Sequence, residues 1–417
     1  MAAILILSRM HALLRILYAV VLPLLNACAQ QQLVHDRYPA WGEEILIDVP
    51  QRKTPLHLRV MMPPQPEKAP ACLLIVHGMN EYVGRYKAIA AHFAQRFIVA
   101  GVDLYGHGLS NPTFLSADRA IASGRLSVDV SDAYLMQSEL RTLKPMQDDL
   151  DQALRYLIER CDAATDSSHP RPLFILSHSL GSLVSALYLS APHTTGGPRD
   201  RVEGIVFSGP AFSVTEVPGW RGWFQNPFVK FSFHTHEHFL TPHDEPLPLM
   251  LFNQVLALVA VPLHDGIIEL LSLPGPRRLF TPTTPGWVVD YLTDWEEEKE
   301  RHRADPYIIR RSLLRYVLSV ERAIIRFRRN MGRFSTPYLL IYSAHDPITP
   351  AWGVHDFAAL TLQTHPDNEL IVLPDKQHHE QLFSAPPLDQ WLLQAIDRWL
   401  DRRLKKQQDS VARGRRD

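Results

Sequence analysis

The sequence predicts an α/β protein with a mostly parallel sheet flanked by helices. Continuous apolar runs of strand length, such as residues 72–76 and 338–342, are typical of parallel strands buried on both faces. Segments with helical apolar spacing, such as residues 86–93 and 146–161, alternate with these runs. Ser179 lies where one apolar run ends abruptly and a helix-like stretch begins. Alternation of strands and helices favours the α/β class.

Eight strand-like runs and three long helical segments account for most of the predicted core. The run at residues 56–61 alternates apolar and polar residues, as a half-exposed edge strand does. The predicted strands cover residues 44–49, 56–61, 72–76, 97–102, 174–177, 204–207, 338–342 and 369–373, and the helices cover residues 86–93, 146–161 and 388–404.

The composition is that of a globular protein with a sizeable core. Of 417 residues, 46% are hydrophobic and 21% are charged, and the formal net charge is -1. This balance gives no bias toward nucleic acid, so none is expected as a partner. The chain has 3 cysteines, too few for a disulfide scaffold. Cys72 and Cys161 could pair, but we expect two separate buried thiols.

The N-terminus has the pattern of a processing segment. An apolar run at residues 16–25 follows basic residues and is too short to span a membrane. Residues 25–28 resemble the lipobox of bacterial lipoproteins, in which the cysteine is lipidated. We expect residues 1–28 to be a signal peptide, Cys28 to tether the chain to a membrane surface, and the protein to reside in a bacterial cell envelope, facing the periplasm or exterior. An uncleaved anchor or a plain signal peptide is the alternative.

A long insertion interrupts the alternation between residues 211 and 335. Because insertions between strands sit at the strand ends, we expect residues 211–335 to form a helical cap with an apolar underside, inserted after the sixth strand. The α/β core would cover residues 40–210 and 336–405, followed by a basic tail at 406–417. The insertion contains apolar helices near residues 249–261 and 308–327 and the aromatic residues Trp220, Trp223, Phe224, Phe228, Phe231 and Phe233.

Ser179 is the candidate nucleophile. A serine on a sharp strand-to-helix turn has a strained backbone, so the residues two positions away must be small. Here they are Ser177 and Gly181, with serine in place of the first glycine of the G-x-S-x-G pattern. The turn predicts an exposed hydroxyl at a helix N-terminus, where free N–H groups favour negative charge.

An acid and a base follow the serine along the chain. A serine hydroxyl needs a base that takes its proton and a third group that orients the base. Asp346 follows the strand at 338–342, and His378 and His379 follow the strand at 369–373. The order Ser…Asp…His is the one found in sheets of this type. We predict Asp346 and His379 as the partners of Ser179, with His378 as the alternative base.

Two backbone N–H groups are expected to stabilise an oxyanion. One belongs to Leu180, directly after the nucleophile, and the other to Met79, directly after His77-Gly78 at a strand end. His77 itself is interpreted as a structural residue that hydrogen-bonds the loop.

These motifs resemble α/β-hydrolases of the monoacylglycerol lipase and lysophospholipase family, also described as the serine aminopeptidase type. The matching segments are residues 77–86, 103–110, 177–181, 304–306 and 379–383, and the resemblance spans about residues 40–400. The departures are Ser177, Tyr82 where the family usually has histidine, and a longer cap. The resemblance implies hydrolysis of a lipid ester with one acyl chain under an apolar cap, without a cofactor.

Other functions stay open. Acyl transfer to another acceptor or peptide cleavage is compatible with the same fold, and so is a non-catalytic, membrane-tethered binding protein. The histidine-rich residues 234–238 lack zinc-site spacing, so we expect a surface or pocket-edge cluster and no metal. The oligomeric state is left open.

Overall fold

The computed structural model describes residues 31–414, with gaps at 51, 53, 165–169, 193–194, 217, 279–285 and 377 and only five positions between 220 and 246. The predicted signal peptide with Cys28 lies outside the described residues. Most of the histidine-rich segment 234–238 also lies outside them, as do Trp220, Trp223, Phe224, Phe228 and Phe231, whereas Phe233 is described.

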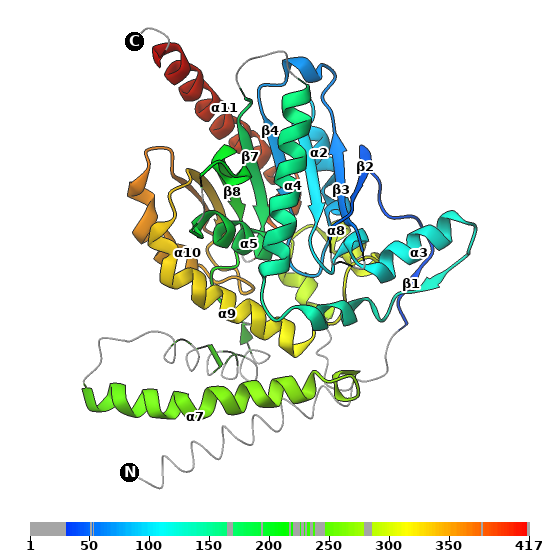
Figure 1. Cartoon of the computed structure of the whole chain (residues 1–417), viewed down its shortest axis with the longest axis vertical. Helices are drawn as coiled ribbons and strands as arrows, with labels where there is room; N and C mark the ends of the chain where they lie inside the picture. The colour runs from blue at the N-terminus through cyan, green and yellow to red at the C-terminus, as the bar shows by residue number, and fades with distance from the viewer. Residues whose placement is uncertain are drawn as a thin grey trace.

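An eight-stranded sheet forms the core, and it confirms the predicted fold class (Figure 1). The order across the sheet is β10-β9-β8-β7-β4-β5-β3-β2. Neighbouring strands are parallel except where β3 pairs with β2 and β5 at one edge. The strands are β2 (Glu43–Ile47), β3 (Leu56–Met61), β4 (Cys72–Val76), β5 (Ile98–Asp103), β7 (Leu173–His178), β8 (Val202–Ser208), β9 (Tyr338–Ser343) and β10 (Glu369–Leu373).

All eight predicted strands are present, with bounds that differ by a few residues. A separate antiparallel pair, β1 (Leu33–Val34) and β6 (Val128–Asp129), was not predicted. Strands of two residues are too short to show a periodic pattern.

Helices cover both faces of the sheet (Figure 1). α2 (Lys87–Phe93) and α11 (Leu388–Gly414) lie on one face, where Leu73 and Ile75 share a core with Trp399. α4 (Lys144–Ala163), α5 (Ser179–Ser190) and α10 (Trp352–Thr361) lie on the other, where Leu74 and Val76 pack. Successive strand residues point to opposite faces, so one continuous apolar run serves both cores. The predicted tail at 406–417 continues the backbone of α11 as far as Gly414.

A disulfide joins Cys72 of β4 to Cys161 of α4, so the expectation of separate thiols is wrong. The two Cα atoms lie 6.5 Å apart, although 89 positions separate the residues along the chain. α4 packs against β4 and β5, and this crossing brings the two thiols together. Sequence spacing carries no information about that contact.

The insertion after β8 contains α7 (Leu247–Leu271), α8 (Glu296–Ala304) and α9 (Leu314–Asn330) (Figure 1). Helix α3 (Pro112–Ala122) contacts the insertion through Phe114, whose ring centre lies 5.5 Å from that of Tyr307. The predicted helix at 308–327 begins later, at Leu314. The backbone before Leu314 is not helical there, because the Ile309 N–H donates to the carbonyl of Asn80, far away in the sequence (2.9 Å). None of the helices in the described part of the chain combines the length and the hydropathy that a membrane-spanning helix needs.

Candidate active site

Ser179 occupies a sharp turn between β7 and α5. Its φ is 49°, a left-handed conformation that costs a non-glycine residue energy. Gly181 is required by packing, because a Cβ there would lie 2.3 Å from the His77 carbonyl oxygen. Ser177 fits in place of the usual glycine because its hydroxyl donates to the Val206 carbonyl (3.2 Å). The small side chain is therefore accommodated with its polar atom bonded.

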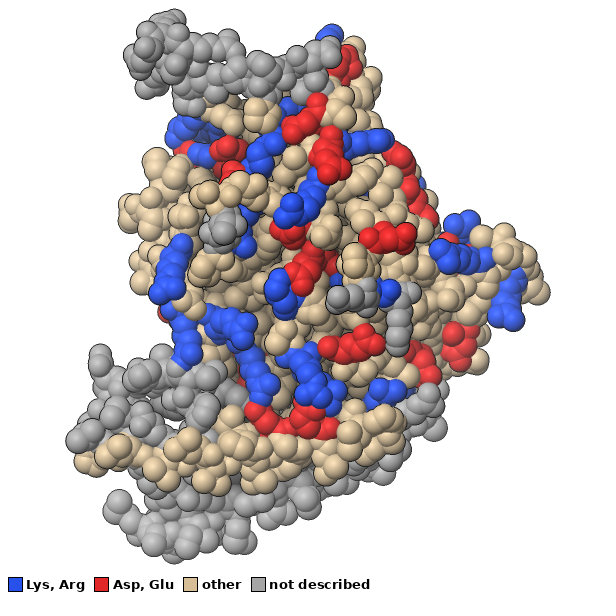
Figure 2. Space-filling model, in the orientation of Figure 1, with Lys and Arg blue, Asp and Glu red and all other residues tan. Residues whose placement is uncertain are grey.

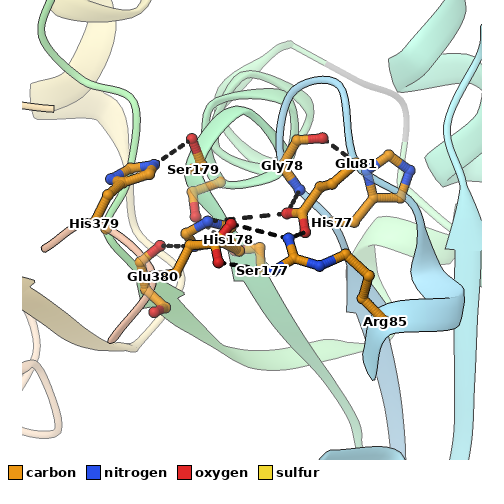
Figure 3. Close-up of polar contacts among 12 residues, drawn as sticks. His77, Gly78, Glu81, Arg85, Ser177, His178, Ser179, His379 and Glu380 are labelled. Carbon is orange, nitrogen blue, oxygen red and sulfur yellow. Dashed lines mark hydrogen bonds and ion pairs between the residues drawn. The ribbon is translucent and has the colours of Figure 1, made fainter. Parts of the chain in front are cut away.

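The structure brings Ser179, His379 and Asp346 together in one chain of hydrogen bonds. Ser179 Oγ lies 2.8 Å from His379 Nε2, and His379 Nδ1 lies 2.7 Å from Asp346 Oδ2. Ser179 is buried, not exposed as the turn alone predicted, since the imidazole packs on its hydroxyl (Figure 3). The three residues follow the C-terminal ends of the parallel strands β7, β10 and β9, and these ends lie on the same side of the sheet.

The loop after β9 fixes the orientation of the Asp346 carboxylate. Oδ1 accepts the backbone N–H groups of Ile348 (2.7 Å) and Thr349 (3.1 Å), and Oδ2 accepts the Thr349 hydroxyl (2.9 Å). Burial raises the pKa of Asp346, but His379 and these hydrogen-bond donors together lower it by a larger amount. The pKa of Asp346 therefore lies below its ordinary value. The carboxylate is ionised and presents Oδ2 to the imidazole.

The charge of Asp346 in turn sets the state of His379. Burial lowers the pKa of His379, but the Asp346 carboxylate raises it by more, and the pKa lies above its ordinary value. With Nδ1–H donated to Asp346, Nε2 is left as the acceptor that faces Ser179. This tautomer is the one a general base requires.

The other two histidines nearby take no part in this chain of bonds. His378 Nε2 lies 2.8 Å from the Ser384 hydroxyl, and burial lowers its pKa. His178 bonds the Ser208 carbonyl through Nδ1 (3.1 Å), and burial lowers its pKa to about 4. The His178 ring is neutral and packs 4.8 Å from the His379 ring. Of the two candidate bases, the structure places His379 against Ser179.

Gly78, directly before Met79, is held through both of its backbone polar groups. Gly78 N–H donates to Glu81 Oε1 (2.6 Å), and His77 Nδ1–H donates to the Gly78 carbonyl (2.7 Å). In a trans peptide the Met79 N–H points opposite to that carbonyl, so its direction is fixed as well. Leu180 is the second residue of α5, where no helical carbonyl can accept its N–H. His77 has the structural role predicted for it, since Nε2 accepts the Leu104 N–H (3.0 Å).

A buried cluster of one arginine and three glutamates adjoins these residues. Figure 3 labels Arg85, Glu81 and Glu380 of this cluster. Arg85 binds Glu380 through two hydrogen bonds (2.9 and 2.8 Å), Glu81 through one (2.6 Å) and Glu298 through one (3.0 Å). Burial lowers the pKa of Arg85, but the glutamates raise it above its ordinary value. The three carboxylates outnumber the guanidinium, and Glu380 and Glu81 both raise the pKa of His379.

This cluster connects the insertion to the site. Glu298 belongs to α8, whereas Glu380 directly follows His379. The backbone also connects the insertion to the site, because the His379 N–H donates to the carbonyl of Tyr291, which belongs to the insertion (2.8 Å). Tyr82, which departs from the family pattern, donates its hydroxyl to Asp305 of the insertion (2.7 Å).

Sequence reasoning missed Thr349 and the four members of the Arg85 cluster. The signal available for Glu81 and Arg85 was their spacing of four residues next to the predicted oxyanion loop. For Glu298 there was none, because three consecutive glutamates are also typical of a solvated helix face.

The fold and the site together define an α/β-hydrolase with a Ser–His–Asp arrangement at a strand-to-helix turn. The chain belongs to the family described as serine aminopeptidase, S33, whose model matches residues 67–383. The family resemblance noted from the motifs is thereby confirmed. No curated protein matches the chain in sequence.

Solved structures of similar fold include several lipases and esterases. A monoacylglycerol lipase from Paleococcus ferrophilus is 17% identical with a TM-score of 0.52, covering 84% of this chain and 99% of that one. A soluble variant of monoglyceride lipase from Saccharomyces cerevisiae is 14% identical, with a TM-score of 0.58 and coverage of 88% and 99%. A carboxyl esterase from Bacillus coagulans is 17% identical, with a TM-score of 0.53 and coverage of 88% and 100%. At these identities the likeness establishes the fold.

Proposed function

We propose that this protein is a serine hydrolase of carboxylic esters and that its substrates are monoacyl lipids, a monoacylglycerol or a lysophospholipid. One observation carries the proposal: an unbroken hydrogen-bond chain from the Ser179 hydroxyl through His379 to Asp346, with each link at 2.7–2.8 Å. The nucleophile, the base and the orienting acid are thus in contact before substrate binds.

The proposed reaction has two halves. Ser179 Oγ attacks the ester carbonyl while His379 Nε2 takes its proton, and the Met79 and Leu180 N–H groups bind the developing oxyanion. His379 then donates that proton to the departing alcohol as the carbon–oxygen bond breaks, leaving an acyl-enzyme. In the second half water attacks the acyl carbonyl while His379 takes a proton from the water. His379 then donates this proton to Ser179 Oγ as the acyl carbon–oxygen bond breaks, which releases the free acid and restores the serine hydroxyl. Asp346 keeps its charge throughout and stabilises the imidazolium.

The choice of a monoacyl lipid rests on the insertion and on the compared structures. Two of these structures are of a monoacylglycerol lipase and a monoglyceride lipase. The insertion is rich in apolar and aromatic residues, and burying each methylene of an acyl chain contributes about 0.8 kcal/mol. A single long chain gains most from such surroundings.

The proposed location is a bacterial cell envelope, with Cys28 lipidated and the hydrolase core on the periplasmic or outer side. The disulfide between Cys72 and Cys161 supports an oxidising compartment. Mass spectrometry of the mature N-terminus would show whether Cys28 carries lipid and has become the first residue.

The test is a Ser179→Ala variant compared with the unaltered chain. We expect a fluorophosphonate probe to label the unaltered protein at Ser179, and the variant to lose both labelling and turnover of short p-nitrophenyl esters and monoacylglycerols. A panel of monoacylglycerols, lysophospholipids, simple esters and peptide amides would identify the substrate. Turnover that persists in a folded Ser179→Ala variant contradicts the mechanism. An unaltered protein that neither labels nor turns over any substrate is instead a non-catalytic binding protein.

A further inference from the structure

Asn80 directly follows the proposed oxyanion donor Met79 and has a backbone conformation that is costly for its residue type. Its φ is 62°, and among the described residues only Ser179 shares a positive φ without being glycine. Asparagine enters this left-handed region more readily than most residues do, yet glycine is the residue that adopts it without cost. An asparagine in this conformation persists only where its surroundings hold it, and such positions cluster at functional sites.

Three hydrogen bonds hold Asn80, and all of them come from segments far away in the sequence. Its backbone carbonyl accepts the Ile309 N–H (2.9 Å). Its side-chain Nδ2 donates to Ser312 Oγ (2.8 Å), and its Oδ1 accepts from Gln137 Nε2 (2.9 Å). Ile309 and Ser312 belong to the insertion, whereas Gln137 belongs to the short helix η4 (Ala133–Glu139) of the core. A glycine could adopt the same φ but could make neither of the two side-chain bonds.

Gln137 closes these contacts into a ring. Its Oε1 accepts the N–H of Leu313, the residue directly before α9 (3.0 Å). Leu313 is joined covalently to Ser312, so the ring runs from Asn80 to Ser312, along the backbone to Leu313, and through Gln137 back to Asn80. We call these four residues the Asn80 ring. Each polar atom of its two side-chain amides has a partner, which fixes both side chains.

Charges at the surface hold this region less firmly than the Asn80 ring does. Figure 2 shows Lys and Arg side chains interspersed with Asp and Glu over the body of the protein. Exposed ion pairs of this kind contribute little to stability. Gln137 and Ser312 are instead buried, at 0% and 7% exposure. Removing one partner of a buried hydrogen bond is costly, because the other partner is left without a bond and away from water.

The Asn80 ring fixes the backbone directly after Met79. Gly78, directly before Met79, is held through its N–H and its carbonyl. With the peptides before and after it fixed, Met79 cannot rotate, and its N–H keeps one direction. An oxyanion donor acts at about 2.7–3.1 Å from the oxyanion, and a misplacement of about 1 Å can cost about a hundredfold in rate. A contact one residue away from the donor is therefore sufficient to change the rate.

We propose that Asn80 is a positioning residue, which holds the Met79 N–H in place for the oxyanion through the Asn80 ring. The inference rests on the proposed ester hydrolysis and adds that residues 309–313 of the insertion contribute to the catalytic site. A movement of this segment away from the core would release Met79 and lower the rate.

The first test compares Asn80→Gly with the unaltered chain. Glycine keeps the backbone conformation accessible and removes both side-chain bonds. We expect kcat for p-nitrophenyl butyrate to fall by about tenfold to a hundredfold with little change in KM, because the oxyanion forms only during the reaction. A trifluoromethyl ketone, which forms an oxyanion adduct with the serine, should bind more weakly by the same factor as the loss in kcat/KM. The acid limb of the pH profile should not move, since the bond between His379 and Asp346 is unaltered.

The second test approaches the same bond from the insertion. Ser312→Ala should lower kcat by up to about tenfold, and Ser312→Thr, which keeps a hydroxyl, should restore most of the loss. In Asn80→Gly combined with Ser312→Ala the second substitution should add nothing, because both remove the same bond. Gln32→Ala is the matched control. It removes two hydrogen bonds to the insertion outside the Asn80 ring, at the carbonyls of Pro306 (2.6 Å) and Ile308 (2.8 Å), and should leave kcat unchanged.

The third test observes Met79 without turnover. In protein that carries isotope-labelled methionine, the amide resonance of Met79 is identified among those of the 9 methionines by its loss in Met79→Leu. We expect this resonance to shift or broaden in Asn80→Gly and to stay in place in Gln32→Ala.

The proposal is overturned if kcat is unaltered in a folded Asn80→Gly variant, or if the Met79 resonance does not change in it. An equal loss of kcat in Gln32→Ala also overturns it, because Asn80 would then merely attach the insertion. Should Asn80→Gly not fold, Ser312→Ala and its Met79 resonance decide in the same way. A Met79 resonance that moves in Asn80→Gly alone supports the positioning role even if the unaltered protein hydrolyses no ester, and that absence of hydrolysis would refute only the proposed function.

Discussion

Replacing Asp346 with asparagine tests how the acid orients the base. In the native site Oδ1 accepts two backbone N–H groups, from Ile348 and Thr349. The introduced asparagine must therefore keep its carbonyl oxygen at that position and turn its NH₂ group toward His379. The NH₂ group donates to Nδ1, and the imidazole proton moves to Nε2. Nε2 then points a proton at Ser179 and cannot act as the base.

The expected loss in kcat is about 10⁴-fold, which corresponds to about 5.4 kcal/mol at 1.36 kcal/mol per factor of ten. KM should change little, because the substitution alters a group behind the base. The assay is steady-state hydrolysis of p-nitrophenyl butyrate, with circular dichroism to confirm the fold.

Thr349→Val is the matched control for Asp346→Asn. It removes the hydroxyl that donates to Oδ2 (2.9 Å) but keeps both backbone donors and the carboxylate. Loss of one such bond should reduce kcat by about tenfold or less. A folded Asp346→Asn variant with a loss no larger than that of the control would refute the assignment of Asp346 as the orienting acid.

Three further substitutions probe features that surround the site. Glu380→Gln removes a carboxylate that raises the pKa of His379, so the acid limb of kcat/KM against pH should move to lower pH. Replacing Cys72 and Cys161 with serine opens a loop of 89 residues, and the free energy of unfolding by urea should fall by up to about 4.6 kcal/mol. Gly181→Ala places a Cβ against backbone oxygens, so we expect a loss of about 1–3 kcal/mol in stability and a fall in kcat.

Each of these has its own control. Glu296→Gln removes a carboxylate of α8 that is exposed and should leave the pH profile in place. Added dithiothreitol should destabilise the native protein but leave the double serine variant unaffected. Gly197→Ala is the control for Gly181→Ala, since nothing lies within 4 Å of a Cβ built at Gly197. The first expectation fails if the acid limb does not move in Glu380→Gln. The second fails if the native protein and the double serine variant unfold at equal urea midpoints. The third fails if Gly181→Ala and Gly197→Ala have equal effects.

The strand pattern and the nucleophile turn could be predicted from local sequence. Buried parallel strands are short apolar runs, and the turn at Ser179 requires small neighbours, so both leave a signature within about ten residues. The order Ser179, Asp346, His379 followed from the rule that catalytic groups gather at the C-terminal ends of strands. The sequence predicted His379 as the base with His378 as the alternative, and it is His379 that the structure places against Ser179.

Tertiary packing decided the remaining features. His379 faces Ser179 because the loop after β10 is bonded to Tyr291 and, through Glu380, to Arg85. The pairing of Cys72 with Cys161 and the hydrogen bond from Asn80 to Ser312 likewise join segments far apart in the chain. A sequence pattern reports the period of a single helix or strand, and hence what it can bury. Which remote segment it meets, and which side it turns toward that segment, is set by the energy of packing all the elements together.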